Sequence, residues 1–215
     1  MSGVQISQLP AIGTGNSGDL LPTTQGYTTP GTGVSYKITA AQLALSALGT
    51  YNVKGYGAKG DGVTDDTAAF IAARNALQTN SAYRGGRLYI PRGIYKPTSA
   101  LTFTQYVAGS GHNIYIEGDG VLNTTLDFSS APAGTDGIVF GAGTQFGVSD
   151  FMINGGRNGL VIGEASGSFA AQFYVRDLRI QNCAQAGLFT QSSFLGEIKN
   201  VWSVGNTNGF VFSGG

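Results

Sequence analysis

Charged residues are scarce in this sequence. Of its 215 residues, 12 are Lys or Arg and 12 are Asp or Glu, which makes 11% against about 25% in an average globular protein. The formal net charge is zero. Without an excess of positive charge, the chain has no long-range field that would draw in nucleic acid or an anionic membrane.

Cysteine and histidine are almost missing. The single cysteine, Cys183, excludes an intrachain disulfide, and it lies in an apolar repeat, so we interpret it as a small core residue. The single histidine, His112, and the lack of CxxC or HxxH spacing argue against a structural zinc site. We expect no metal and no cofactor.

Long apolar runs are also missing, and none is long enough to span a bilayer. Residues 1–12 lack the charged start and apolar stretch of a signal peptide, so we expect synthesis in a cytoplasm. Glycine, in contrast, is abundant, with 35 residues, about twice the usual share. This composition is typical of a fold with many tight bends and fits a helical bundle poorly.

The first fifty residues differ from the rest. They hold short strand candidates at 4–9, 20–25 and 36–38, separated by loops rich in Gly, Thr and Pro. Thr39 is a candidate N-cap for a helix over 40–48, which Gly49 would end. Its apolar face needs a cover, and we expect a neighbouring subunit to supply it; the residues concerned are Leu43, Leu45 and Leu48.

A second part opens at Tyr51. The pattern predicts a strand over 52–57, a tight turn over 58–62, and strands over 87–90 and from Ile94. Between them, Asp65 or Asp66 would start an amphipathic helix that runs to about Gln78. The residues predicted on its buried face are Ala69, Phe70, Ala73 and Leu77.

From Asn113 onward the sequence repeats. A glycine followed by apolar residues recurs at intervals of 22, 28 and 22, in 137–140, 159–162, 187–190 and 209–212. A second motif recurs at intervals of 27 and 23, in 148–153, 175–180 and 198–203. Short strands without intervening helices exclude βαβ units, and a propeller blade would need about 40 residues. A solenoid of short parallel strands fits both intervals.

The second motif predicts a bend in each turn of the solenoid. Val148 and Phe151 are three residues apart, so both cannot face inward in an unbroken strand. The chain must therefore kink at Asp150, Asp177 and Asn200, residue types that tolerate left-handed backbone. Stacked aspartates about 4.8 Å apart also approach the carboxylate spacing of a retaining glycosidase. Because Asn fills the third position, we interpret the set as a turn ladder.

Asp61, Asp65 and Asp66 form the most conspicuous acidic cluster. A paired-carboxylate catalytic site is one interpretation. The alternative, which we favour, is structural, because carboxylates in turns and at helix N-termini accept hydrogen bonds from free N–H groups. Aromatic residues could supply sugar-stacking surfaces; most alternate with polar residues and face the core, among them Phe140, Phe151 and Phe212. The surface candidates for glycan binding are Tyr83, Tyr106 and Tyr174.

Residues 57–70 followed by 85–95 resemble the opening signature of the pectate-lyase-like β-helix superfamily, a module of many bacteriophage tailspikes and tail fibres. The resemblance implies a mostly β fold, a right-handed parallel β-helix with an N-terminal capping α-helix, and a homotrimer. Residues 1–49 resemble the small α+β virion-attachment segments that precede such β-helices. The implied division is 1–49 for attachment with a linker helix, 50–110 for the cap and 111–215 for the first rungs.

The resemblance also implies a function. We expect a tail fibre or tailspike in the virion, docked on a tail, baseplate or adaptor protein through residues 1–49 and directed at host surface polysaccharide. One alternative is a depolymerase, hydrolase or lyase, of capsule or lipopolysaccharide; another is a purely structural tail component. Because the sequence stops inside a rung motif, we expect the N-terminal part of a longer polypeptide and no catalytic residues within it. We predict neither nucleic-acid binding nor membrane insertion.

Overall fold

The computed structural model describes residues 20–22, 37–39, 49–79, 85–103, 113–141, 143–163 and 170–213. The chain divides into two units, Met1–Ala44 and Leu45–Gly215. In the first, β1 (Leu20–Pro22) and β2 (Lys37–Thr39) pair antiparallel, so two of the predicted strands are present. The strand predicted over 4–9 and the helix over 40–48, with Leu43, Leu45 and Leu48, lie outside the described residues.

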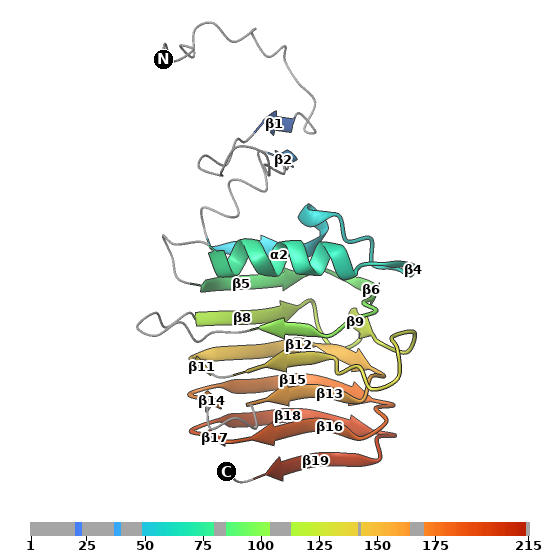
Figure 1. The fold of residues 1–215 in the computed structure, drawn as a ribbon, viewed down its shortest axis with the longest axis vertical. Helices are drawn as coiled ribbons and strands as arrows, with labels where there is room; N and C mark the ends of the chain where they lie inside the picture. Colours follow the sequence, from blue (N-terminus) through green and yellow to red (C-terminus); the bar gives the residue numbers. More distant parts are fainter. Residues whose placement is uncertain are drawn as a thin grey trace, which may run out of the picture. The chain divides into compact units, whose positions relative to one another are not determined.

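The second unit is a stack of short parallel strands (Figure 1). Its largest sheet contains β3 (Thr50–Asn52), β4 (Asp61–Asp65), β5 (Gly85–Ile90), β6 (Gly93–Lys96), β8 (Asn113–Gly118), β9 (Thr124–Asp127), β12 (Phe146–Asn154), β15 (Tyr174–Gln181) and β18 (Glu197–Val204). A second sheet contains β7 (Leu101–Phe103), β10 (Ile138–Phe140), β13 (Asn158–Ile162), β16 (Ala186–Gln191) and β19 (Asn208–Ser213). A third contains β11 (Gly143–Thr144), β14 (Ala170–Ala171) and β17 (Ser193–Phe194).

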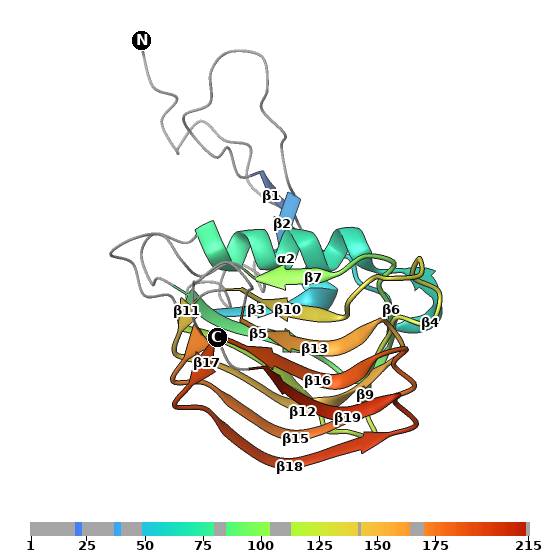
Figure 2. The same ribbon diagram turned by 60° about the horizontal axis from the view of Figure 1, so that its bottom comes forward.

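The strand register reproduces the sequence repeats. In the second sheet, Ile138 pairs with Leu160, Leu160 pairs with Leu188, and Leu188 pairs with Phe210, so each copy of the glycine motif lies beside the next copy. In the largest sheet, the second motif repeats in the same way from β12 through β15 to β18. The sheets curl around a common interior (Figure 2). The predicted mostly β, β-helix-like fold is therefore confirmed.

The largest sheet bends within its long strands. Asp150, Asp177 and Asn200 have φ values of 66°, 48° and 51°, at the positions where strand parity placed the kink. Before the bend β12 pairs with β8, and after it with β9, so one strand connects two parts of the sheet. The Asn200 Nδ2 donates to the Asp177 Oδ1 at 3.0 Å, which links the bends of two successive rungs.

Stacked aromatic side chains fill the interior. The rings of Phe103 and Phe140 lie 5.2 Å apart, and those of Phe140 and Phe146 lie 4.3 Å apart; Phe173 continues the stack at 5.3 Å. Burial of Phe140, Phe151 and Cys183 agrees with their predicted core positions. Phe212 does not: its side chain is 65% exposed, because β19 is an edge strand that pairs only with β16 among the described residues.

The start of the second unit differs from prediction in two elements. Residues 53–56 form a 3-10 helix instead of continuing the strand predicted over 52–57, because the Asn52 side chain accepts the N–H of Lys54 and Gly57 ends the turn at a φ of 104°. The predicted turn over 58–62 is also too long, since β4 begins at Asp61.

The helix α2 spans Thr67–Thr79, close to its predicted bounds. Phe70, Ala73 and Leu77 are buried as expected. The helix packs against β3, β5 and β7, at the end of the stack that contains the first strands of the second unit (Figure 1). Its role as a cap stays a prediction. No helix in the described residues is long and apolar enough to cross a membrane.

Candidate functional site

The acidic cluster near α2 is built of carboxylates that accept local hydrogen bonds. Asp61 accepts the N–H groups of Thr64 at 2.8 Å and Val63 at 2.9 Å, and these bonds lower its pKa to about 2. Asp65 accepts the N–H of Thr67 at 2.9 Å, at the helix N-terminus, and the hydroxyl of Thr98 at 3.0 Å. Hydrogen bonds from Thr67 and Thr98 lower its pKa. Both groups are ionised at neutral pH, so neither is poised as a general acid.

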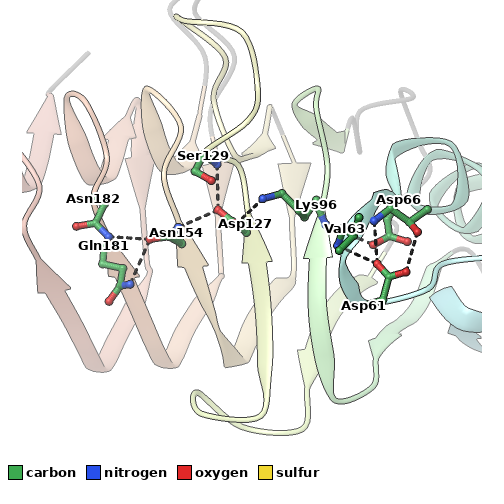
Figure 3. Close-up of polar contacts among 10 residues, drawn as sticks. Asp61, Val63, Asp66, Lys96, Asp127, Ser129, Asn154, Gln181 and Asn182 are labelled. Carbon is green, nitrogen blue, oxygen red and sulfur yellow. Dashed lines mark hydrogen bonds and ion pairs between the residues drawn. The ribbon is translucent and has the colours of Figure 1, made fainter.

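Asp66 connects the loop before β4 to β6. Its carboxylate accepts the N–H of Lys59 at 2.6 Å. It also accepts the N–H of Lys96 at 3.3 Å (Figure 3). Asp66 is 2% exposed, so its carboxylate is largely hidden from any substrate. The hydrogen bonds of the three aspartates support the structural interpretation over a catalytic one.

The outer face of the largest sheet gathers a different set of side chains. Before the bend, the register aligns two outward columns across β5, β8, β12, β15 and β18. We call these ten residues the tyrosine–arginine face: Arg87, Tyr115, Gly147, Tyr174 and Glu197 in one column, and Tyr89, Glu117, Ser149, Arg176 and Lys199 in the other.

Two tyrosines stack at the centre of this face. The rings of Tyr115 and Tyr174 lie 5.8 Å apart with 19° between their planes, although β12 separates their strands. Gly147 lies between them in the register, and a Cβ there would lie 2.1 Å from the Tyr174 ring. The missing side chain at Gly147 therefore makes room for the ring of Tyr174 to lean across the strand.

Ion pairs flank the stacked rings. The guanidinium of Arg176 lies 4.6 Å from the centroid of the Tyr174 ring and pairs with Glu197. Arg87 pairs with Glu117 at 2.9 Å. Burial raises the pKa of Tyr174, so its hydroxyl stays protonated and able to donate a hydrogen bond at neutral pH. The face thus offers aromatic carbon, a hydroxyl and guanidinium N–H groups side by side.

After the bend, the outer face carries a row of polar contacts (Figure 3). Lys96 pairs with Asp127 at 3.1 Å, and Asn154 donates to the same carboxylate at 2.8 Å. Gln181 and Asn182 then donate to the Asn154 carbonyl oxygen at 3.2 and 2.7 Å. Burial opposes ionisation of Asp127, but the bonds from Asn154, Ser129 and Lys96 outweigh it and lower its pKa. We interpret this row as a structural ladder between rungs.

Of the three tyrosines predicted as glycan contacts, the structure describes one. Tyr174 lies on the tyrosine–arginine face, partly exposed, whereas Tyr83 and Tyr106 lie outside the described residues. The sequence pattern did not point to Tyr115 or Arg176. The outward positions of the repeated motif would have identified Arg176, but Tyr115 comes before the first copies of the two motifs, at 137–140 and 148–153. The described residues contain no group of three or more His, Cys, Asp or Glu side chains that could hold a metal ion.

Residues 50–117 match a family model described as rhamnogalacturonase A/epimerase, pectate lyase-like. A curated relative, the mannuronan C5-epimerase AlgE5 of Azotobacter vinelandii, is 37% identical over 113 residues, which cover 50% of this chain and 11% of that protein. The matched region therefore spans about a tenth of that relative's length. With the coiled parallel sheets, the match gives this chain a pectate-lyase-like fold.

Two phage-encoded structures have similar folds. ORF18 of Geobacillus virus E2 aligns with a TM-score of 0.56 and 25% identity over 70% of this chain and 29% of that protein. The pre-mature gene product 12 of bacteriophage phi29 aligns with a TM-score of 0.56 and 19% identity over 79% of this chain and 25% of that protein. In each case the alignment spans less than a third of the longer protein.

Proposed function

We propose that this protein is a phage tail protein that recognises host surface polysaccharide through the outer face of its β-helix. The likeness to ORF18 of Geobacillus virus E2 supports a phage origin. The pectate-lyase-like match and the relation to a mannuronan epimerase support a glycan ligand. Its place of action would then be the virion tail.

The tyrosine–arginine face is the observation that carries this proposal. Tyrosine combines an apolar ring with a polar hydroxyl, a pairing that suits the C–H and O–H groups of a sugar. The stack of Tyr115 on Tyr174 and the pairing of Arg176 with Glu197 fix these groups before any ligand arrives. Preorganised groups bind with a smaller loss of conformational entropy.

Purified protein and a panel of bacterial capsule polysaccharides, lipopolysaccharides and alginate test this proposal by isothermal titration calorimetry. We expect saturable binding of at least one glycan. Absence of binding across the panel would favour the rival proposal of a purely structural tail component that positions a separate receptor-binding protein.

A second candidate function is enzymatic modification of the glycan, favoured by the relation to the AlgE5 epimerase. Release of reducing ends, or absorbance from unsaturated sugars, would reveal hydrolase or lyase activity. We expect no turnover by residues 1–215, since Asp61, Asp65 and Asp66 are held in local hydrogen bonds and the pKa values of Asp61 and Asp65 are lowered. Robust turnover would contradict a function in recognition alone and would show that the protein depolymerises the glycan.

We further propose that residues 1–49 attach the protein to the virion and that a homotrimer buries Leu43, Leu45 and Leu48. Deletion of residues 1–48 should abolish incorporation into particles while leaving glycan binding intact. Sedimentation at micromolar concentration should give a trimer. Assembly of the deletion variant into virions would contradict the attachment role, and a monomer would contradict the trimer.

A further inference from the structure

The outer face continues past the Asp150–Asp177–Asn200 bend as a column with a different character. The register aligns five outward positions there: Ile94, Thr125, Met152, Arg179 and Trp202. Ile94 is 50% and Trp202 52% exposed. Arg179 is the charged residue of the column, placed between Met152 on one neighbouring strand and Trp202 on the other.

Arg179 differs from the other arginines of this sheet. Of the three that its described strands carry, Arg87 and Arg176 each pair with a glutamate. Arg179 has neither a hydrogen bond nor an ion pair among the described residues; its Nε atom is buried without a partner, as are those of Arg87 and Arg176. Along its own strand the nearest acid, Asp177, instead accepts the Asn200 amide. A partly buried guanidinium without an anion is an incomplete arrangement, because buried donors are normally paired.

We propose that Arg179 and Trp202 form a subsite for a negatively charged sugar, a site separate from the tyrosine–arginine face. The guanidinium supplies paired N–H donors that match the oxygens of a carboxylate or phosphate. Trp202, one strand away, supplies an exposed aromatic surface for the ring of that sugar or of its neighbour. Adjacent strands lie about 4.8 Å apart, so both side chains are within reach of one or two sugar residues.

This inference rests on the proposed recognition of polysaccharide and adds the charge of the ligand. It predicts that one glycan chain crosses the bend, with its sugars on the tyrosine–arginine face and its anionic group at Arg179. The anion could be a carboxylate or a phosphate, and the choice of glycans in the experiment separates the two.

The test compares R179Q with the unchanged protein in calorimetric titrations. The carboxylated probes are alginate, polygalacturonate and polysialic acid, wall teichoic acid carries phosphate, and dextran is neutral. We expect R179Q to weaken binding of the anionic probe about tenfold or more, the effect of losing a charged hydrogen bond. The matched control is K59Q, which removes an exposed positive charge in the loop before β4, outside both proposed glycan surfaces, and should change affinity less than about twofold.

A second variant, W202A, should weaken binding of the same probe without removing charge, and added salt should weaken binding less in R179Q than in the unchanged protein. Circular dichroism should show equal melting temperatures for the three variants and the unchanged protein. Equal losses in R179Q and K59Q, or binding of dextran alone, would overturn the Arg179 subsite while leaving glycan recognition in place. Failure of these five glycans and of every capsule polysaccharide and lipopolysaccharide to bind would overturn both proposals.

Discussion

Tyr174 lies across Gly147 and stacks on Tyr115, with 5.8 Å between the ring centroids. This contact joins side chains from β15 and β8, which both pair with β12 and do not pair with each other. A glycine in the intervening strand is what permits it. The tyrosine–arginine face therefore depends on a residue that has no side chain.

The G147A variant tests this dependence. The added Cβ would lie 2.1 Å from the far end of the Tyr174 ring, which can swing away. We expect a loss of less than about 1 kcal/mol in the free energy of unfolding, as for ordinary surface changes, together with a clear change in tyrosine fluorescence. Chemical denaturation and emission spectra measure the two effects. An unchanged spectrum would show that Gly147 does not set the position of the ring.

The control for that variant is G137A. A Cβ at Gly137 would lie 2.4 Å from the carbonyl oxygen of Gly159, a backbone atom of the neighbouring strand that cannot move alone. We expect G137A to destabilise the protein more than G147A in the same denaturation experiment. The reverse order would contradict the assigned register of the second sheet.

The interior aromatic stack should dominate stability. Phe140 is 1% exposed and contacts the rings of Phe103 and Phe146, so F140A should lower the free energy of unfolding by about 3–5 kcal/mol. Phe189, an outward residue of β16, is only partly buried, and F189A should lower it much less. Urea denaturation compares the two. Equal losses would mean that the stack contributes no more than a surface ring.

Acid should destabilise the protein partly through Asp136. Its carboxylate accepts two bonds from the Arg157 guanidinium and others from Asn158, which outweigh the effect of burial and lower its pKa. A lowered folded-state pKa contributes stability above the unfolded value of about 3.9, and this contribution is lost as the pH falls through the folded value. Acid unfolding should therefore set in below about pH 4.

The D136N variant should lower the free energy of unfolding by about 1–2 kcal/mol at pH 7, a value reduced because Arg157 is half exposed. Its stability should also vary less with pH below 4. The exposed pair of Arg176 and Glu197 supplies the control, since E197Q should change stability by less than about 0.5 kcal/mol. Denaturation midpoints measured between pH 2 and 7 test this prediction. If the midpoint of D136N changes with pH as steeply as that of the unchanged protein, Asp136 takes no part in the acid response.

Much of the fold could be predicted from the repeated motifs. Their spacing predicted the solenoid, and strand parity placed the bends at Asp150, Asp177 and Asn200, because inward positions are governed by a fixed two-residue period. The 3-10 helix at Val53–Tyr56 was missed because one hydrogen bond, from the N–H of Lys54 to the side chain of Asn52, decides between turn and strand there. Such a local competition leaves no periodic signal.

Less of the candidate site could be predicted from the sequence. Tyr174 was identified as a surface residue, but its partner Tyr115 lies 59 positions earlier, and the two meet only because two rungs stack in register over Gly147. The unpaired state of Arg179 likewise depends on which outward neighbours the register supplies. Contacts between rungs follow from the lengths of the loops between strands, which vary from turn to turn in this chain.

The most direct test of glycan recognition is calorimetric titration of the unchanged protein and the double variant Y115A/Y174A with whichever bacterial polysaccharide binds most tightly. Y115F/Y174F is the matched control, since it keeps the stacked rings and loses only the hydroxyls. We predict at least a tenfold weaker affinity for the alanine variant, an intermediate loss for the phenylalanine variant, and equal melting temperatures. Unchanged affinity in the alanine variant would contradict recognition through the tyrosine–arginine face.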